Sequence, residues 1–154
     1  MRVVVVVVGK PREPTLAAVI EEYETRAARY WPLDVHEVRE EAARGASPDV
    51  VREREGERLL ARVPAGAEVV ACDVDGTAMR SEAFAQWLQR TRESARSVAL
   101  LIGGAFGLSD EVRARAKSRL SLAPWTLPHE MARLVLAEQL YRAGTIIRGE
   151  PYHK

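Results

Sequence analysis

The chain has 154 residues and a nearly balanced charge, with 23 basic and 22 acidic side chains. This length suits one domain with a sizeable core, and 47% hydrophobic with 29% charged residues excludes a disordered chain. The single cysteine excludes an internal disulfide and a cysteine zinc cluster. No apolar run reaches membrane-spanning length, so the sequence predicts no membrane segment and a cytoplasmic location.

Apolar patterns of strand length alternate with patterns of helical spacing along the chain. The valine run after Met1-Arg2 has no polar face, which is typical of a strand buried on both sides in a parallel sheet. Serine caps predict helix starts at Ser47-Pro48 and Ser109-Asp110. In chain order, the predicted strands are residues 3–8, 33–38, 68–74, 98–102 and 120–122. The predicted helices are residues 15–30, residues 48–63, a helix that begins at Ser81, a helix of about ten residues after Ser109, and residues 130–143. The helix after Ser109 carries the basic residues Arg113, Arg115, Lys117 and Arg119.

This alternation predicts an α/β fold with a mainly parallel sheet of about five strands. The last predicted helix is apolar on more than one side, so we expect a partner subunit or another part of the chain to bury it. Gly56 lies inside a predicted helix, where glycine is unfavourable; a close approach by another backbone would explain it, and so would simple tolerance of the glycine.

The stretch from Ser97 to Leu108 has the most distinctive local pattern. An apolar strand runs into Gly103-Gly104, Gly107 follows, and Ser109 caps the next helix. Such a loop either brings backbone N–H groups to a ligand or only makes a tight turn with positive φ, and the stretch alone leaves both open. No P-loop and no Rossmann glycine pattern is present, which excludes the common nucleotide-binding motifs.

The segment Asp73-Val74-Asp75-Gly76-Thr77 resembles the nucleophile motif of haloacid-dehalogenase-type phosphatases, in which two aspartates and Mg²⁺ act on a phosphoryl group. The motif lies in mid-chain, and too few residues follow it for the rest of that fold. We expect Asp75-Gly76 to be a turn that ends its strand. The three histidines lack zinc-site spacing, and no Gly-x-Ser-x-Gly motif occurs, so we predict no metal site and no serine triad.

Ordered motifs along the whole chain carry a resemblance to one family. They are Val8-Gly9-Lys10, Glu22-Tyr23, Glu55-Gly56-Glu57, Leu101-Ile102-Gly103-Gly104-Ala105-Phe106-Gly107, Leu120-Ser121-Leu122, Thr126-Leu127-Pro128-His129, Tyr141-Arg142-Ala143 and Pro151-Tyr152-His153-Lys154. Together they closely resemble the RlmH family, the 23S rRNA pseudouridine N3-methyltransferases of the SPOUT superfamily. The match predicts a single SPOUT methyltransferase domain over residues 1–154.

The resemblance implies an α/β fold with a deep C-terminal trefoil knot and S-adenosylmethionine as the cofactor. A knot would account for a last helix that is apolar on several sides. By motif, the cofactor contacts would be Cys72, Gly103, Leu122, Ala123, Pro124, Trp125, Thr126 and Leu127. Cys72 departs from the leucine usual at this position, and packing against adenine should survive because free cysteine behaves as a small hydrophobe.

The resemblance also implies which residues act on the substrate. Methyl transfer to N3 of pseudouridine requires the ring nitrogen to lose its proton, either to a base or with the help of a cation that favours the anion. Arg142 and His153 are the candidates for these tasks, and Tyr152 is the candidate for positioning the base by stacking.

The family acts as a homodimer in which one subunit contributes to the other's site, and its substrate lies in a stem-loop at the subunit interface of the assembled ribosome. The resemblance therefore implies a second copy of the chain and the ribosome, through its 23S rRNA, as partners. The basic residues after Ser109 are candidates for phosphate contacts. The alternative is a non-catalytic ribosome- or RNA-binding module on the same fold, with a phosphatase that uses Asp73 and Asp75 as the third candidate.

Overall fold

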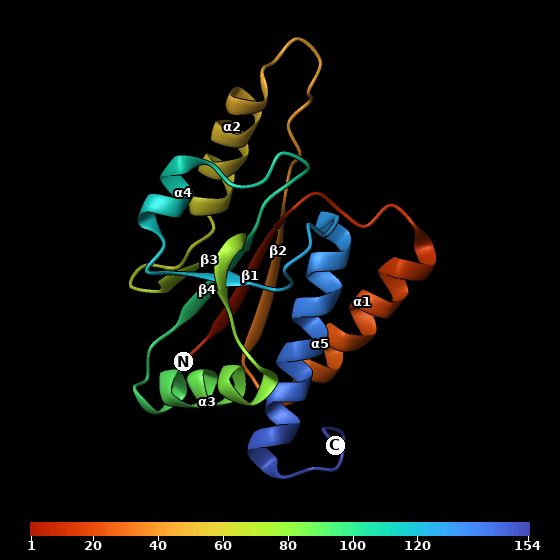
Figure 1. Cartoon of the computed structure of the whole chain (residues 1–154), viewed down its shortest axis with the longest axis vertical. Helices are drawn as coiled ribbons and strands as arrows, with labels where there is room; N and C mark the ends of the chain where they lie inside the picture. Colours follow the sequence, from red (N-terminus) through yellow and green to blue (C-terminus); the bar gives the residue numbers. More distant parts are fainter.

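Five strands form one parallel sheet in the order β2-β1-β4-β3-β5. A computed structural model describes the whole chain, residues 1–154 (Figure 1). The strands are β1 (Val3–Val8), β2 (Leu33–Val38), β3 (Glu68–Ala78), β4 (Val98–Ile102) and β5 (Ser118–Ser121). The helices are α1 (Pro14–Ala27), α2 (Pro48–Leu60), α3 (Ser81–Glu93), α4 (Asp110–Arg115) and α5 (His129–Arg148). The predicted α/β class and the parallel sheet are confirmed, and β2 and β5 are the edge strands.

The valine run of β1 forms the inside of the molecule. The odd-numbered valines from Val3 to Val7 belong to one core cluster, and the even-numbered valines from Val4 to Val8 belong to the other. Successive side chains of a strand point to opposite faces, so a strand in the middle of a covered sheet needs apolar residues at every position. The unbroken run of valines therefore matches the position of β1 in the interior of the sheet.

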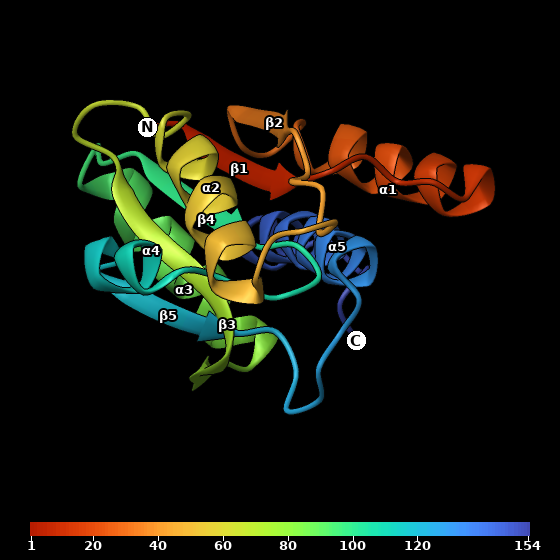
Figure 2. The same cartoon turned by 90° about the horizontal axis from the view of Figure 1, so that it is seen from above.

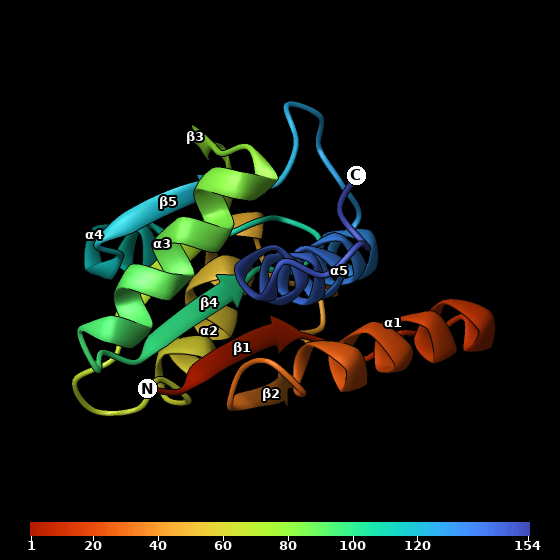
Figure 3. The ribbon, with the colours of Figure 1, turned by 90° about the horizontal axis from the view of Figure 1, so that it is seen from below.

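The helices form a layer on each face of the sheet (Figures 2 and 3). On one face, α5 packs between α1 and α3, and the indole N–H of Trp31 donates to the Leu140 carbonyl of α5 at 2.8 Å. On the other face, α2 and α4 pack against each other, with Leu59 and Val112 in the second core cluster. Each face of the sheet thus has its own apolar core.

Other parts of the same chain bury the last helix, α5, which is one of the two possibilities expected from the sequence. It follows the edge strand β5, yet it contacts the central strands β1 and β4 as well as α1 and α3. It runs to Arg148, beyond the predicted end at residue 143. Gly144 lies within the helix, where the Tyr30 ring occupies the space that a side chain would need, and the helix stops at Gly149, whose φ is +68°.

The helix after Ser109 is shorter than predicted. It has six residues, and Ala116 leaves the helical conformation with φ −67° and ψ 129°. The Lys117 N–H then donates to the Val69 carbonyl of β3 at 2.9 Å, which joins the chain to the sheet. Arg119 consequently lies in β5, and the four basic residues do not share one helix as the sequence pattern suggested.

The expected turn at Asp75-Gly76 is wrong. β3 continues to Ala78, and its pairing with β5 shifts register so that Leu120 is opposite both Cys72 and Thr77. The residues between them form an irregularity inside the strand, of the kind that bends a strand next to a binding site.

Candidate cofactor pocket and C-terminal cluster

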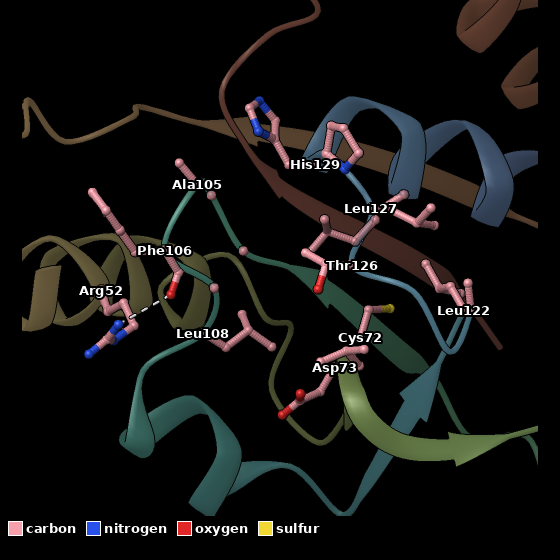
Figure 4. A pocket seen from close by; sticks show the side chains of 18 of the residues that line it. Arg52, Cys72, Asp73, Ala105, Phe106, Leu108, Leu122, Thr126, Leu127 and His129 are labelled. Carbon is pink, nitrogen blue, oxygen red and sulfur yellow. Dashed lines mark hydrogen bonds between the residues drawn. The ribbon is translucent and has the colours of Figure 1, made fainter.

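A cavity of about 730 Å³ lies at the end of β4 and beside the middle of β3, bounded by the loop after β4 and the segment before α5 (Figure 4). The carboxyl ends of parallel strands are the usual ligand-binding edge of an α/β sheet. The lining residues are Arg52, Cys72, Asp73, Val74, Ile102–Leu108, Arg113, Leu122, Ala123, Trp125–His129 and Ala132. The volume and the largely apolar lining suit a ligand of cofactor size.

One wall is the glycine loop, residues 103–109. A side chain at Gly103 would meet the backbone of Gly107 at 2.7 Å, and Gly107 itself has φ +80°. Gly104 and Gly107 form an isolated bridge, and the Ser109 hydroxyl accepts from the Val112 N–H at 3.2 Å as the predicted cap of α4. The glycines therefore make a tight turn, which confirms one of the two roles considered for this loop, and the turn lines the pocket; contact of its backbone with a ligand stays a prediction.

Seven of the eight predicted cofactor residues line this pocket. They are Cys72, Gly103, Leu122, Ala123, Trp125, Thr126 and Leu127. Pro124 is in the same segment but outside the lining, with its side chain exposed. Trp125 stands at the rim with 79% of its surface exposed. The residues thus converge from three distant segments, and their contacts with a cofactor remain a prediction.

Sequence reasoning missed several lining residues, among them Arg52, Asp73, Arg113 and His129. Asp73 is 7% exposed and joins three segments: it accepts from Arg113 Nε at 2.8 Å and from the Asp75 N–H at 3.1 Å, and Arg119 Nη1 lies 3.8 Å away. Burial opposes ionisation, but these donors outweigh it and hold the pKa of Asp73 below its usual range. The Asp73 carboxylate is therefore engaged in ion pairs with arginine side chains.

Cys72 contributes an apolar wall and no reactive thiolate. Burial, with a smaller effect from the neighbouring Asp73 carboxylate, raises the pKa of Cys72 to about 12. The thiol is neutral at physiological pH, so its role is that of a small hydrophobe, as expected for the residue that replaces leucine here.

The three predicted catalytic residues form a separate cluster at the far end of α5. Arg142 Nη1 lies 3.2 Å from His153 Nδ1, and its guanidinium lies 4.7 Å from the centre of the Tyr152 ring. The Tyr152 ring in turn packs against Tyr141, with 4.6 Å between ring centres. The structure therefore brings the three side chains together, and their catalytic roles stay a prediction.

Two carboxylates that the sequence did not reveal organise this cluster. Glu138 accepts from Arg142 Nε at 2.9 Å and Nη2 at 2.6 Å, and from the Tyr152 hydroxyl at 3.0 Å. This pairing raises the pKa of Arg142, while burial together with the nearby Tyr23 and Glu138 raises the pKa of Tyr152. Glu82 of α3 lies 3.2 Å from His153 Nε2. Only the i,i+4 spacing of Glu138 and Arg142 could have signalled any of this.

The pocket lies at the N-terminal end of α5, whereas the cluster lies further along the helix and in the segment after it. His129 begins the helix and lines the pocket, whereas Arg142 comes 13 positions later (142 minus 129). At the rise of an α-helix this separation is about 20 Å. One chain therefore does not bring its own cluster to its own pocket.

The fold and this pocket define a class of knotted α/β methyltransferases. The family model described as "Predicted SPOUT methyltransferase" matches residues 1–153. The crystal structure of TrmJ from Z. mobilis covers 100% of this chain and 73% of its own, with a TM-score of 0.53 at 17% identity. A probable methylase family protein from Haemophilus influenzae covers 99% and 70%, with a TM-score of 0.55 at 13% identity. The predicted C-terminal trefoil knot is the fold of this class.

Sequence relatives narrow the class. Ribosomal RNA large subunit methyltransferase H of Gemmatimonas aurantiaca is 68% identical over 154 residues, 100% of both chains. The protein of that name from Clostridium kluyveri is 38% identical over 159 aligned positions, again over 100% of both. The chain belongs to the ribosomal RNA large subunit methyltransferase H family of SPOUT methyltransferases, and its cofactor is S-adenosylmethionine.

The structure has no candidate membrane span and no candidate metal site. No helix combines the length and apolarity needed to cross a bilayer. No group of three or more histidine, cysteine, aspartate or glutamate side chains is arranged to hold a metal ion.

Proposed function

We propose that this chain methylates N3 of a pseudouridine in 23S rRNA, within the assembled ribosome, and that it acts as a homodimer. The observation that carries the proposal is the convergence of the predicted cofactor residues on one pocket, in a chain 68% identical along its length to a named large-subunit rRNA methyltransferase. The relatives' name supports rRNA as the substrate class. The choice of nucleoside and atom rests on the motif resemblance described above.

The residues of the pocket fit S-adenosylmethionine. Cys72, Leu122 and Leu127 offer an apolar slot for the adenine, and the glycine loop offers backbone close to the ligand. Arg52 and Arg113 lie at the edge of the pocket, where they suit the cofactor's carboxylate. When bound, the cofactor supplies an activated methyl group on a sulfonium. The task of the chain is to hold that methyl in line with the acceptor nitrogen.

A second copy of the chain would complete the site. Methyl transfer needs donor and acceptor in contact, at about 3 Å, whereas the pocket and Arg142 are about 20 Å apart along α5. An antiparallel or crossed arrangement of two copies would place the Arg142–Tyr152–His153 cluster of one over the pocket of the other. The separation within one chain thus supports the expected homodimer.

The geometry favours Arg142 over His153 as the group that acts on N3. An arginine only donates, so His153 Nδ1 accepts from Arg142, and His153 Nε2–H therefore donates to Glu82. Both ring nitrogens are engaged in this arrangement, and neither is open to accept the substrate proton. Arg142 stays charged, and its guanidinium would stabilise the anion that forms as N3 loses its proton.

Methyl transfer to ribosomes that lack the modification tests the proposal. Purified chain and labelled cofactor should methylate whole ribosomes, and mapping should place the methyl group on one pseudouridine of 23S rRNA. Cofactor and ribosome binding without transfer would contradict the proposal in favour of the binding module. Phosphatase activity that requires Mg²⁺ and is lost in Asp73→Asn would contradict it in favour of the third candidate.

A further inference from the structure

The helix α2 supports the glycine loop from behind. Arg52 Nη1 donates to the Phe106 carbonyl at 3.3 Å (Figure 4). One turn later, Glu55 lies against Gly104, where an added Cβ would be 2.8 Å from Glu55 Oε1 and 3.1 Å from Val8 Cγ1. Side chains at this spacing share one face of a helix. That face of α2 therefore fixes the position of the loop.

The neighbouring Gly56 completes the contact. A Cβ at Gly56 would overlap the Ser109 hydroxyl and lie 3.1 Å from Ser109 Cβ. This is the close approach expected for a glycine inside a helix, with a side chain rather than a backbone as the neighbour. The loop is therefore held at three points, and Glu55 is the only one of them that is titratable and buried.

Glu55 is an unusual residue to find there. It is 2% exposed, and burial raises its pKa. Its Oε2 accepts from the Glu41 N–H at 3.1 Å, while its Oε1, on the Gly104 side, has no hydrogen-bond partner. A buried carboxyl without a partner is costly, and much more so when it is charged. The buried and partly unpaired carboxyl of Glu55 therefore needs a functional explanation.

The charged groups around Glu55 act in both directions. Glu40, from the segment after β2, raises the pKa of Glu55, whereas Arg58 of α2 and His129 of α5 lower it. Arg58 is itself paired with Glu41. The glycine loop faces Glu55 with no charged side chain, and β1 faces it with Val8. The surroundings thus provide no dedicated counter-charge for an ionised Glu55.

We propose that Glu55 is a positioning residue of the cofactor pocket, whose carboxyl fills the space behind Gly104 and sets the affinity for S-adenosylmethionine. Gly104 lines the pocket, and Glu55 is outside the lining, so Glu55 acts through the loop without touching the ligand. The neutral carboxyl fits this space. Its ionisation would place an unpaired charge against the loop and loosen it.

The raised pKa of Glu55 determines how cofactor affinity changes with pH. Since the pKa of Glu55 is raised above its ordinary 4.5, the neutral form and its stabilisation are fully present below that value. The contribution is lost as the pH rises through the raised pKa. Cofactor affinity should therefore fall with rising pH, whereas Glu55→Gln, which stays neutral, should bind with an affinity that does not follow this titration.

The test measures S-adenosylmethionine binding by calorimetry on the full chain between roughly pH 5 and 8, with thermal unfolding alongside. Glu55→Gln should bind within about twofold of the unchanged chain at the acid end, because its shape is conserved. Glu55→Ala and Gly104→Ala should each bind about tenfold more weakly, since one leaves a hole and the other a clash. Exposed Glu57 supplies the matched control, Glu57→Gln, with no expected change.

The double variant gives the sharpest result. In Glu55→Ala with Gly104→Ala, the added methyl occupies space that the carboxyl has left, so binding should recover most of the loss caused by Gly104→Ala alone. Binding by Glu55→Ala equal to the unchanged chain would overturn the proposal. So would a Glu55→Gln variant as weak as Glu55→Ala, or a double variant no better than Gly104→Ala. If Glu55→Ala does not fold, the pH profile of Glu55→Gln and the effect of Gly104→Ala decide.

Discussion

The two ends of α5 are built on different principles. At its start, the cofactor pocket is shaped mainly by backbone and apolar side chains, with a glycine loop supported from behind by α2. From its middle onward, α5 carries the C-terminal cluster, a network of charged and aromatic side chains around Glu138. Backbone fixes a pocket before the ligand arrives, whereas a side-chain network can exchange its internal partners for a substrate. The comparison supports the proposal that the pocket binds the cofactor and that the cluster acts on the substrate.

The largest expected effect separates the two ends. Arg142→Ala should lower methyl transfer by about 10² to 10³-fold, the range seen when a group that stabilises a developing anion is removed. Cofactor affinity should be nearly unchanged, because Arg142 is not among the residues that line the pocket and its proposed contact is with the substrate. Single-turnover transfer to ribosomes and calorimetry check the two halves. A comparable loss in both measurements would break the division between the ends.

Arg142→Lys is the matched control. It keeps the charge but cannot make the paired contact with Glu138. Transfer should fall less than in Arg142→Ala if the charge is what favours the anion. Equal loss in the two variants would assign the effect to the shape of the network instead.

The second effect concerns the pocket. Gly103→Ala should weaken S-adenosylmethionine binding by about ten- to a hundredfold, because its methyl would meet the Gly107 backbone, which cannot move without opening the turn. The arrangement of the C-terminal cluster should be unaffected. Calorimetry measures the loss, and near-normal binding would show that the loop is softer than its geometry indicates.

A smaller effect tests the ion pairs beside the pocket. Asp73→Asn should lower the free energy of unfolding at neutral pH by about 1–2 kcal/mol, since it removes a charge held by Arg113 and Arg119. The pKa of Asp73 is lowered, so this stabilisation is present above the ordinary value of 3.8 and is lost as the pH falls through the lowered pKa. Urea unfolding at several pH values should show the two proteins converge in acid. A constant difference would refute the charge-based explanation.

The smallest effect is at the pocket rim. Trp125→Ala should weaken cofactor binding by no more than a few-fold, because 79% of the side chain is exposed and little of it can be buried against the ligand. Leu127→Ala, deeper in the same segment, is the comparison and should cost more. The reverse order would mean that Trp125 folds over the bound cofactor.

The sequence located what is locally encoded. Every strand was anticipated because the apolar runs, above all the valines of β1, leave little choice of structure. The features that were missed depend on partners far away in the chain. β3 extends past Asp75-Gly76 because β5 pairs with it, and α4 ends early because Lys117 bonds to β3. Tertiary pairing overrides local turn and helix preferences at both places.

The site residues divide in the same way, into those that local motifs predict and those that depend on contacts with distant parts of the chain. The motifs predicted seven residues of the pocket and all three of the cluster. Glu82 could not be predicted, because its contact with His153 joins residues 71 positions apart. The role of Glu55 depends likewise on what lies behind a loop, which no spacing in the sequence indicates.

Complementation between two impaired variants tests the central claim, that the two ends of α5 meet only between subunits. Gly103→Ala weakens the pocket and Arg142→Ala weakens the cluster, so each alone should transfer methyl at no more than about a tenth of the normal rate when the cofactor is kept below its weakened binding constant. In a mixed dimer, one site would combine the intact pocket of one chain with the intact cluster of the other. Co-refolded in equal amounts, the two variants should regain roughly a quarter of normal transfer, since half of the dimers are mixed and each has one intact site. A mixture no more active than the variants alone, while normal chains treated in the same way recover, would contradict the account.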